Sequence, residues 1–185
     1  MKIPKNAKKV FTGVIYDIYQ WPQKMFDGTT ETFELSKRKD SIQLIVTTPD
    51  KKILILQERH PHMKKSFYGV LGGSQEGNET MLQTAKRELL EETGYTSDDW
   101  KLLKKSSPGD KTDWTIYTYI ARNAKQTQKQ HLDAGEKIKV IPMNFKKFMK
   151  IATGPNFRSI DLTFYLLKLH YQKKLKEFEK KLFSK

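Results

Sequence analysis

The chain has 185 residues, and 35 Lys and Arg against 21 Asp and Glu give it a formal net charge of +14. At this length one domain is expected, and a hydrophobic fraction of 37% is enough to form a core. The absence of cysteine excludes disulfides, thiolate metal sites and cysteine nucleophiles, so a metal site must use oxygen or imidazole ligands. Because the sequence has no apolar run of about 18 residues and no apolar signal segment at its start, we expect a cytoplasmic protein without a membrane span.

The positive charge suggests a nucleic-acid partner, because a basic protein gains binding free energy when it releases counterions from phosphates. The distribution of the charge weakens this interpretation. Residues 168–185 hold seven Lys and two Glu, which is typical of the solvated face of an amphipathic helix, with nucleic-acid or anionic-membrane contact as the alternative. The segment 76–92 is locally acidic, and a polyanion binder without a metal has no use for such a segment. Nucleic acid is therefore a partner that we do not favour.

The first third of the sequence has the composition of β-strands, in which β-branched and aromatic residues are enriched. Asp27-Gly28 is a turn signal, and Pro49-Asp50 separates two strongly apolar runs, which predicts a hairpin. A further short strand is expected to end at Gly72-Gly73. The predicted strands of this part cover residues 10–19, 29–36, 41–48, 52–57 and 67–71.

A helical pattern begins at Asn78, a suitable N-cap residue, and ends at Gly94, a residue typical of helix C-termini. Between them Leu82, Ala85 and Leu89 recur at helical spacing. The pattern then predicts strands at 114–121 and 138–141, a loop at 124–130, and helices at 144–152 and 159–182.

The chain has no internal repeat and no low-complexity linker, so we expect a single domain over residues 1–185. Within it we expect an N-terminal strand extension over about residues 1–40 and a C-terminal helix within 156–185. The residues expected to face the core from that helix are Leu162, Leu166 and Leu169, followed by a thinner stripe of Tyr171, Leu175, Phe178 and Leu182.

Three glutamates stand close together on the helix predicted between Asn78 and Gly94. At about 100° per residue, Glu88, Glu91 and Glu92 fall within an arc of about 100°, where like charges repel by roughly 0.2–0.5 kcal/mol per pair. A divalent cation would reverse the sign of this interaction, although a solvated acidic helix face is the plainer alternative. Carboxylate oxygens select Mg²⁺ or Mn²⁺, and Mg²⁺ prefers a few carboxylates together with substrate phosphate oxygens and water. The implied substrate is therefore phosphorylated.

Neighbouring residues fit such a site. Gly72 and Gly73 allow the backbone to approach closely, and a carbonyl oxygen there could serve as a further ligand. Arg87 can hold Glu79 or Glu91 in a fixed rotamer through a bidentate pair. Arg87 would then orient a metal ligand without itself touching the metal.

The whole segment from Gly73 to Tyr95 resembles the Nudix box, G-x5-E-x7-R-E-U-x-E-E-x-G-U, in which U is an aliphatic residue. Tyr95, at the last U, is the one departure, and this bulkier apolar residue should alter packing more than chemistry. All seven fixed letters are present, as Gly73, Glu79, Arg87, Glu88, Glu91, Glu92 and Gly94.

The resemblance implies a Nudix fold, an α/β architecture with a three-layer α/β/α sandwich around a mixed sheet, here with additional N-terminal antiparallel strands. It also implies that the chain hydrolyses a nucleoside diphosphate linked to another group X, with Mg²⁺ or Mn²⁺ as the cofactor. The residues implied as metal ligands are Glu88 and Glu92, with Glu91 close by and the Gly72 carbonyl contributing. The residues implied to be structural are Gly73, Glu79, Arg87 and Gly94.

Outside the box the sequence is similar to the ADP-ribose or ADP-sugar pyrophosphatase branch of that family. The segment 56–61, Leu-Gln-Glu-Arg-His-Pro, looks like a strand end whose arginine contacts substrate phosphates in the branch, which makes Arg59 a candidate phosphate ligand. Pro108 follows the box where the branch has a characteristic proline, at slightly closer spacing than usual. The segment 132–136 is similar to an acidic loop that supplies a catalytic glutamate, which makes Glu136 the candidate general base.

Two acids are alternatives to Glu136 as the base: Asp133 in the same loop, and Glu91, because a box glutamate serves in some relatives. Members of the branch usually form homodimers in which N-terminal strands complete the partner's site. Trp21 or Phe26 is therefore a candidate for stacking on adenine, although a core or dimer-interface role is the alternative for Trp21.

The resemblance thus leads us to expect a Mg²⁺- or Mn²⁺-dependent enzyme that hydrolyses ADP-ribose or another nucleoside diphosphate sugar to a nucleoside monophosphate and a sugar phosphate. One alternative is hydrolysis of another Nudix substrate, such as a damaged nucleoside triphosphate or the 5′ end of an RNA. The other is a non-catalytic module that binds a nucleotide or a partner, which the three retained carboxylates disfavour.

Overall fold

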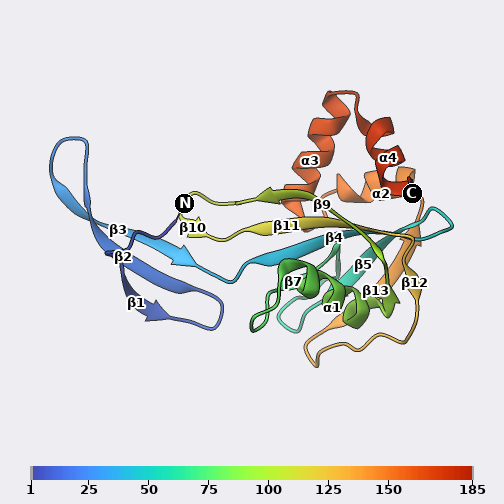
Figure 1. Ribbon diagram of the computed structural model, residues 1–185, viewed down its shortest axis with the longest axis horizontal. Helices are drawn as coiled ribbons and strands as arrows, with labels where there is room; N and C mark the ends of the chain where they lie inside the picture. The colour runs from blue at the N-terminus through green and yellow to red at the C-terminus, as the bar shows by residue number, and fades with distance from the viewer. Residues whose placement is uncertain (1, 185) are drawn as a thin grey trace.

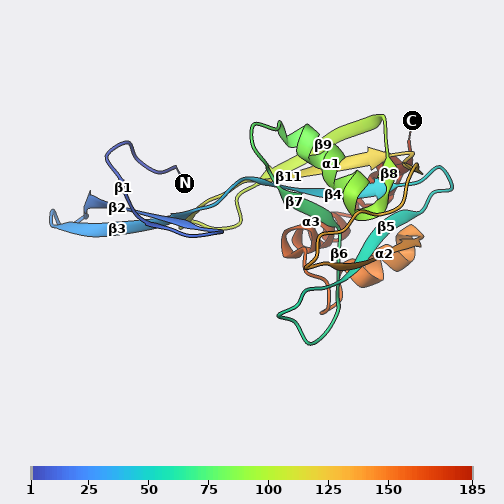
Figure 2. The same ribbon diagram turned by 90° about the horizontal axis from the view of Figure 1, so that it is seen from below.

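The computed structural model describes residues 2–184, which form a body and an elongated arm (Figure 1). The arm is a four-stranded sheet in the order β1-β2-β3-β10, and it projects from one end of the body as a single layer (Figure 2). Its longest part is the antiparallel hairpin of β2 and β3. The strands of the arm are β1 (Lys8–Thr12), β2 (Asp17–Lys24), β3 (Thr30–Lys37) and β10 (Thr112–Asp113).

The body is built around a mixed sheet with the order β13-β5-β4-β11-β9, in which β11 runs parallel to β4 and the other neighbours are antiparallel. Its strands are β4 (Ser41–Thr47), β5 (Ile53–Arg59), β9 (Asp99–Ser106), β11 (Ile116–Arg122) and β13 (Lys137–Met143), with β6 (Phe67–Gly69) beside β5 and β7 (Leu71–Ser74) beside β4. The helices are α1 (Met81–Thr93), α2 (Phe145–Ala152), α3 (Ile160–Tyr171) and α4 (Leu175–Phe183).

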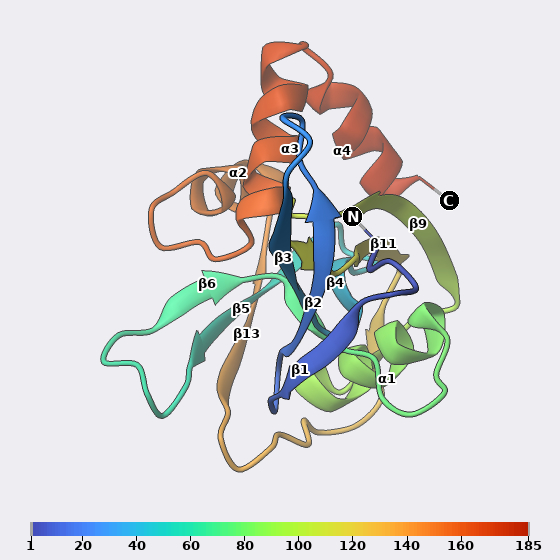
Figure 3. The same ribbon diagram turned by 90° about the vertical axis from the view of Figure 1, so that its left-hand side faces the viewer.

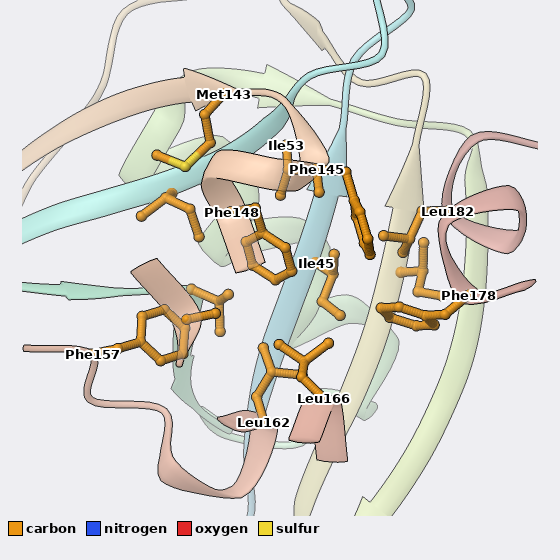
Figure 4. Packing of buried hydrophobic residues seen from close by; sticks show 14 residues of the cluster. Ile45, Ile53, Met143, Phe145, Phe148, Phe157, Leu162, Leu166, Phe178 and Leu182 are labelled. Carbon is orange, nitrogen blue, oxygen red and sulfur yellow. The ribbon is translucent and has the colours of Figure 1, made fainter. Parts of the chain in front are cut away.

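The sheet separates two apolar cores, because successive residues of a strand point to opposite faces. Ile45 and Ile53 face α2, α3 and α4, where Phe148 is fully buried (Figure 4). Leu44, the neighbour of Ile45, packs on the other face with Leu89 of α1. Strand β4 is buried along its whole length because it supplies both cores. This arrangement is the three-layer α/β/α architecture that the sequence predicts.

Two strand predictions differ from the structure. The strand predicted at 10–19 is two strands, because the chain turns between them and the Gly13 amide donates to the Tyr16 carbonyl at 3.0 Å. The strand predicted to end at Gly72-Gly73 instead breaks at Val70 and runs through both glycines as β7. There it pairs with β4, which brings the two glycines into the sheet next to α1.

Two further elements are not predicted from the sequence. Strand β9 pairs with β11, and the register shifts beside Leu103, so a bulge breaks the alternation that would have revealed the strand. The segment 124–130, predicted as a loop, contains the short strand β12 (Lys125–Gln126), which pairs with β8 (Tyr95–Thr96) at the end of α1.

Helix α1 begins two residues later than predicted. Its N-cap is Thr80, whose hydroxyl accepts from the Gln83 amide while the Gln83 side chain accepts from the Thr80 amide at 2.8 Å. This reciprocal capping box satisfies two amide groups that Asn78 would leave free. The helix ends as predicted at Gly94, which has a φ of 73°.

The long C-terminal helix predicted at 159–182 is two helices. The chain turns between α3 and α4 at Lys173, which has a φ of 57°. The turn folds α4 back onto the body, where Phe178 and Leu182 are buried in the core with Leu162. The lysine-rich end is therefore part of the folded body. No helix within residues 2–184 is long and apolar enough to cross a membrane.

Three chain segments join the arm to the body, and hydrogen bonds link two of them, those between β3 and β4 and between β10 and β11. The Trp114 indole donates to the Ser41 hydroxyl at 2.9 Å, and the Thr115 amide donates to the Asp40 carboxylate at 2.9 Å. The Ser41 amide in turn donates to the Thr115 carbonyl at 3.0 Å. These cross-links hold the two segments side by side and so fix where the arm leaves the body.

Leu44→Ala should lower the free energy of unfolding by about 3 kcal/mol, because Leu44 is fully buried and its neighbours cannot close the cavity. Urea unfolding followed by circular dichroism measures this, with the slope m unchanged. Leu102→Ala is the matched control, since Leu102 is 41% exposed on the same sheet and should lose about 1 kcal/mol or less. Equal losses for the two variants would contradict the two-core packing.

Candidate active site

The glycines of β7 allow α1 to approach the sheet closely. A Cβ atom on Gly73 would overlap the carboxylate of Glu88, and one on Gly72 would come within 2.7 Å of the Ile42 carbonyl oxygen. The Gly72 amide donates to the carboxylate of Glu92 at 3.3 Å. The two glutamates implied as metal ligands therefore lie directly against the two glycines.

Arg87 is at the centre of the ion pairs of this region. Its guanidinium contacts Glu79 at 2.9 Å, Glu91 at 2.8 Å and Glu88 at 3.1 Å. It also donates to the Ser74 carbonyl at 3.2 Å, which ties α1 to the end of β7. The structure thus brings Arg87 into contact with both Glu79 and Glu91, the two carboxylates predicted as its partners. The ion pair turns the Glu91 side chain toward Arg87.

The structure adds Glu58, a carboxylate that sequence reasoning missed. Glu58 lies near the end of β5, and β13, which begins directly after Glu136, pairs antiparallel with that end. This pairing brings Glu58 and Glu136 to the same edge as Glu88 and Glu92. Glu136 raises the pKa of the other three carboxyls, and Glu58 and Glu88 also raise the pKa of Glu92. The signal in the sequence was a charged residue two positions after the buried apolar run 53–56 of the same strand.

Burial dominates the electrostatics of these acids. It raises the pKa of the Glu58 and Glu88 carboxyls to about 7, and the pKa of Glu92 well above its ordinary value. The neighbouring carboxylates add to the shift, Glu136 at Glu58 and Glu58 at Glu92, while the Arg87 guanidinium opposes it at Glu88. Glu58, Glu88, Glu92 and Glu136 therefore share one field, and we call them the carboxylate cluster.

The loop that carries Glu136 is fastened to the C-terminal end of α1. The Thr127 and Gln128 amides donate to the Gly94 carbonyl at 2.9 and 3.2 Å, and the His131 amide donates to the Glu91 carbonyl at 2.9 Å. A Cβ on Gly94 would collide with the carbonyl of Gln128. The glycine that ends the helix is thus also required for the loop to lie against it.

Arg59 and Glu136 line one open cavity of about 520 Å³. Lys137 and Lys139 line the same cavity, so its walls carry three cations and one acid. Asp133, the alternative base, accepts from the Glu136 amide through its carbonyl at 2.9 Å, and its own amide donates to the Glu136 carboxylate at 3.3 Å. Asp133 thus contacts Glu136 within the loop, and Glu136 is the acid that lines the cavity.

A second cavity of about 440 Å³ lies between the arm and α1, on the other side of Glu88. Tyr16 and Arg38 line it, and neither was identified from the sequence. The Arg38 guanidinium stacks on Trp114 at 4.2 Å from the ring centroid and lies 5.6 Å from that of Tyr16, while its Nε is buried without a hydrogen-bond partner among residues 2–184. A cation held between aromatic rings beside an acid is suited to a planar polar ligand.

Three other predicted residues lie outside these cavities. Trp21 is 7% exposed, packs on Phe33 with ring centroids 5.1 Å apart, and is part of the arm. Phe26 is fully exposed at the tip of the β2–β3 hairpin. Pro108 is exposed between β9 and β10. Within one chain the structure does not bring these residues to the carboxylate cluster.

The donor set fits a hard divalent cation. All four members of the cluster offer oxygen. Burial and neighbouring carboxylates raise the pKa of Glu58, Glu88 and Glu92, so positive charge is lacking around these three. Among residues 2–184, no three His, Asp or Glu side chains stand close enough together to enclose a metal as they are oriented here. Glu91 in particular is turned to Arg87. Side-chain rotation of Glu88, Glu92 or Glu58 is therefore needed to close such a site.

Gly73→Ala should lower the affinity for Mn²⁺ about 10–100-fold, because the added methyl group would occupy the volume of the Glu88 carboxylate. Isothermal titration of the protein with Mn²⁺ measures this. Gly109→Ala is the control, since its methyl group would meet Thr112 at an ordinary 3.6 Å. An unchanged affinity in a folded Gly73→Ala protein would exclude Glu88 as a ligand.

In the metal-free protein the free energy of unfolding should fall as the pH rises from about 4.5 to about 7. The folded pKa of Glu58 and Glu88 is raised from 4.5 to about 7, so in this range the folded state retains protons that the unfolded state has lost. Urea unfolding in a chelator at several pH values measures the trend. Glu58→Gln should reduce the slope, and a slope unaffected by Glu58→Gln would contradict the shared field.

Comparison with known proteins identifies the family of this chain. The NUDIX domain family matches residues 37–159. An ADP-ribose pyrophosphatase of Bacillus subtilis (strain 168) is 26% identical over 149 residues, which cover 78% of this chain and 79% of that protein. A methanol dehydrogenase activator of Bacillus methanolicus is 25% identical over 148 residues, which cover 78% of this chain and 80% of that protein.

A solved structure described as an ADP compounds hydrolase superposes with a TM-score of 0.72 over 92% of this chain and 95% of that chain. At 17% identity this likeness shows the fold alone. The family match contains the entire segment Gly73–Gly94 and also Arg59 and Glu136. Nudix hydrolases generally use divalent metal ions, in agreement with the donor chemistry of the cluster. Since the family match covers well over half of the chain, the protein belongs to the NUDIX family and is a Nudix hydrolase.

Proposed function

We propose that this Nudix hydrolase cleaves the diphosphate of ADP-ribose or another nucleoside diphosphate sugar, giving a nucleoside monophosphate and a sugar phosphate. The observation that carries the proposal is the pair of cavities on either side of the cluster, one lined by Arg59 and Glu136 and the other by Arg38 and Glu88. A substrate with a diphosphate at its centre and a bulky group at each end suits such a site. The relative named as an ADP-ribose pyrophosphatase supports the same assignment.

We propose Mg²⁺ as the cofactor, with Mn²⁺ as an alternative. Glu88, Glu92 and the Gly72 carbonyl would hold it, and the buried Glu58 is near enough to Glu92 to share in its charge balance. When bound, the cation polarises phosphoryl oxygens and stabilises negative charge on them. Glu91 is placed in the same group by its sequence, but its ion pair with Arg87 favours a positioning role.

The chain's own groups then have separate tasks. Glu136 is the proposed general base, because it lines the cavity with Arg59 and can accept a proton from an attacking water. Arg59 offers a charged, bidentate contact for a phosphate in the same cavity. Tyr16 and Arg38 offer a stacking surface for the base of the nucleotide. Trp21 and Phe26 could reach this base only from a second chain.

We also propose that the protein is a homodimer, in the cytoplasm, a compartment that suits a chain without cysteine. The arm supports the dimer. It is a single-layered sheet whose strand β1 is exposed at every residue, and Phe11 and Val14 are among the large apolar side chains that it leaves in solvent. A sheet of this size without a covering layer is marginally stable alone, so a second copy is the natural cover.

Incubation of the protein with ADP-ribose and Mg²⁺ should release AMP and ribose phosphate. Glu92→Gln should lower turnover by roughly three orders of magnitude or more, and Glu136→Gln by about 10²–10⁴-fold with little change in KM. A panel of nucleotides read by product mass in ¹⁸O water identifies both the leaving group and the attacked phosphorus. Turnover of another nucleotide without AMP release from ADP-ribose would overturn the substrate, and full activity of Glu92→Gln would overturn the site.

A further inference from the structure

One wall of the cavity beside Glu136 carries like charges on neighbouring strands. In the antiparallel pairing of β5 with β13, Lys137 lies directly opposite Arg59, and Lys139 lies directly opposite Gln57. Residues that are directly opposite each other, and residues two apart on one strand, point to the same face of a sheet. Arg59, Lys137 and Lys139 therefore stand together on one face, and we call them the cation trio.

The cation trio has no acidic partner in the described part of the chain. Within residues 2–184 none of its three members forms a salt bridge. Like charges directly opposite each other on two strands destabilise a sheet, and the arm avoids this by placing Asp17 of β2 opposite Lys37 of β3. An anionic ligand in the cavity would relieve the repulsion within the cation trio.

Glu136 lies between the cation trio and the rest of the carboxylate cluster. Leu56 of β5 packs with α1, so alternation places Glu58 on the α1 face of the sheet and Arg59 on the opposite face. Glu136 lines the cavity of the cation trio, and its charge also raises the pKa of Glu58 and Glu92. Figure 3 shows β5 and β13 side by side, with the loop before β13 running from α1 to the start of that strand. A group that extends past Glu136 from the cluster therefore meets the cation trio.

The proposed function assigns one end of the substrate to each cavity. The base of the nucleotide is assigned to the cavity of Tyr16 and Arg38, so the group X enters the cavity of the cation trio. A neutral sugar in that cavity would leave the repulsion within the trio unchanged. A phosphate ester on X would bring a charge of about −1.5 to −2 and three acceptor oxygens. A carboxylate brings one negative charge and two oxygens, which suits three cations less well.

We propose that the group X itself carries a phosphate, which Lys137 and Lys139 bind, while Arg59 is shared between this phosphate and the diphosphate. The Gln57 amide and the Ser66 hydroxyl line the same cavity and offer neutral donors to the same oxygens. The inference rests on the proposed function and adds to it the charge of X. ADP-ribose then remains a substrate, and a counterpart phosphorylated on its sugar is the better one.

The reaction needs only water as a second reactant. The water oxygen bonds to one phosphorus of the diphosphate, Glu136 accepts the proton, and the bond from that phosphorus to the bridging oxygen breaks. The products are a nucleoside monophosphate and a sugar that carries two phosphates. The phosphate held by the cation trio takes no part in the bond changes, so it acts through binding.

The first test compares ADP-ribose with ADP-ribose 1″-phosphate, which differ only by a phosphate on X. With Mg²⁺ present, kcat/KM for AMP release should be about tenfold or more higher for the phosphorylated compound, mainly through a lower KM. The advantage should shrink as the salt concentration rises, because the cation trio is exposed to solvent. Equal values of kcat/KM, or a preference for ADP-ribose, would overturn the proposal.

The second test asks whether the preference depends on the cation trio. Lys139→Gln should lower kcat/KM for ADP-ribose 1″-phosphate at least about fivefold more than it lowers kcat/KM for ADP-ribose. Lys101→Gln is the matched control, because it removes the same charge from an exposed position on β9, at the opposite edge of the same sheet. The control should change the ratio of the two values less than about twofold. A Lys139→Gln protein that keeps the wild-type ratio would overturn the proposal.

A binding measurement separates this inference from the proposed activity. Isothermal titration with ribose 5-phosphate and with ribose 1,5-bisphosphate requires no hydrolysis. The bisphosphate should bind about tenfold or more tightly, and Lys139→Gln should remove most of the difference. If this difference holds while neither nucleotide releases AMP, the proposed activity fails and the phosphate site stands. If the two sugar phosphates bind equally while ADP-ribose releases AMP, the phosphate site is overturned and the proposed activity stands.

Discussion

Burying several carboxylates next to one another costs free energy, because each loses its water and repels its neighbours. In this protein the only guanidinium among the box residues, Arg87, contacts Glu79, Glu88 and Glu91 and so compensates part of that cost. Glu92 is 6% exposed and receives one long hydrogen bond, from the Gly72 amide. The remaining deficit of positive charge is what would give the site an affinity for the proposed cation. The close packing of α1 against β7 and the hydrogen bonds between the Glu136 loop and the end of α1 hold these carboxylates near one another.

The positions of the basic residues change the interpretation of the positive net charge. Arg38 and Lys39 line the cavity on one side of the carboxylate cluster, and Arg59 and Lys139 line the cavity on the other side. The proposed diphosphate substrate would be attracted to this basic surround, and it would need a cation to lie beside the acidic centre. Most of the remaining excess lies in the helical layer on the opposite face of the sheet, away from this chemistry.

The features that could be predicted from the sequence are those that depend on the spacing of residues close together in the chain. The box residues are close in the chain, so helical periodicity alone places Glu88 and Glu92 on one face, and Gly94 marks the helix end. Glu58 and Arg38 could not be found this way, because their neighbours at the site are brought there by the pairing of β5 with β13 and by the packing of the arm against the body. The same limit applies to β7: whether Gly72 ends a strand or lies within one depends on its partner β4, thirty residues earlier in the chain.

Helix α3 shows a more general limit. Hydrophobic periodicity identifies an apolar face but does not say what covers it. The pattern at 159–182 predicted the burial of Leu162 and Leu166 correctly, but it also placed Tyr171 on the core stripe, and Tyr171 is 89% exposed because the helix ends there. The turn at Lys173 folds α4 into the core, while Ile160, Phe164 and Leu167 of α3 stay exposed on the other side of that helix. The arm presents the converse case, a sheet with apolar residues and no layer over them. Periodicity and alternation identify both surfaces as apolar, and in neither case do they identify what covers the surface, because a cover is set by contacts outside the element.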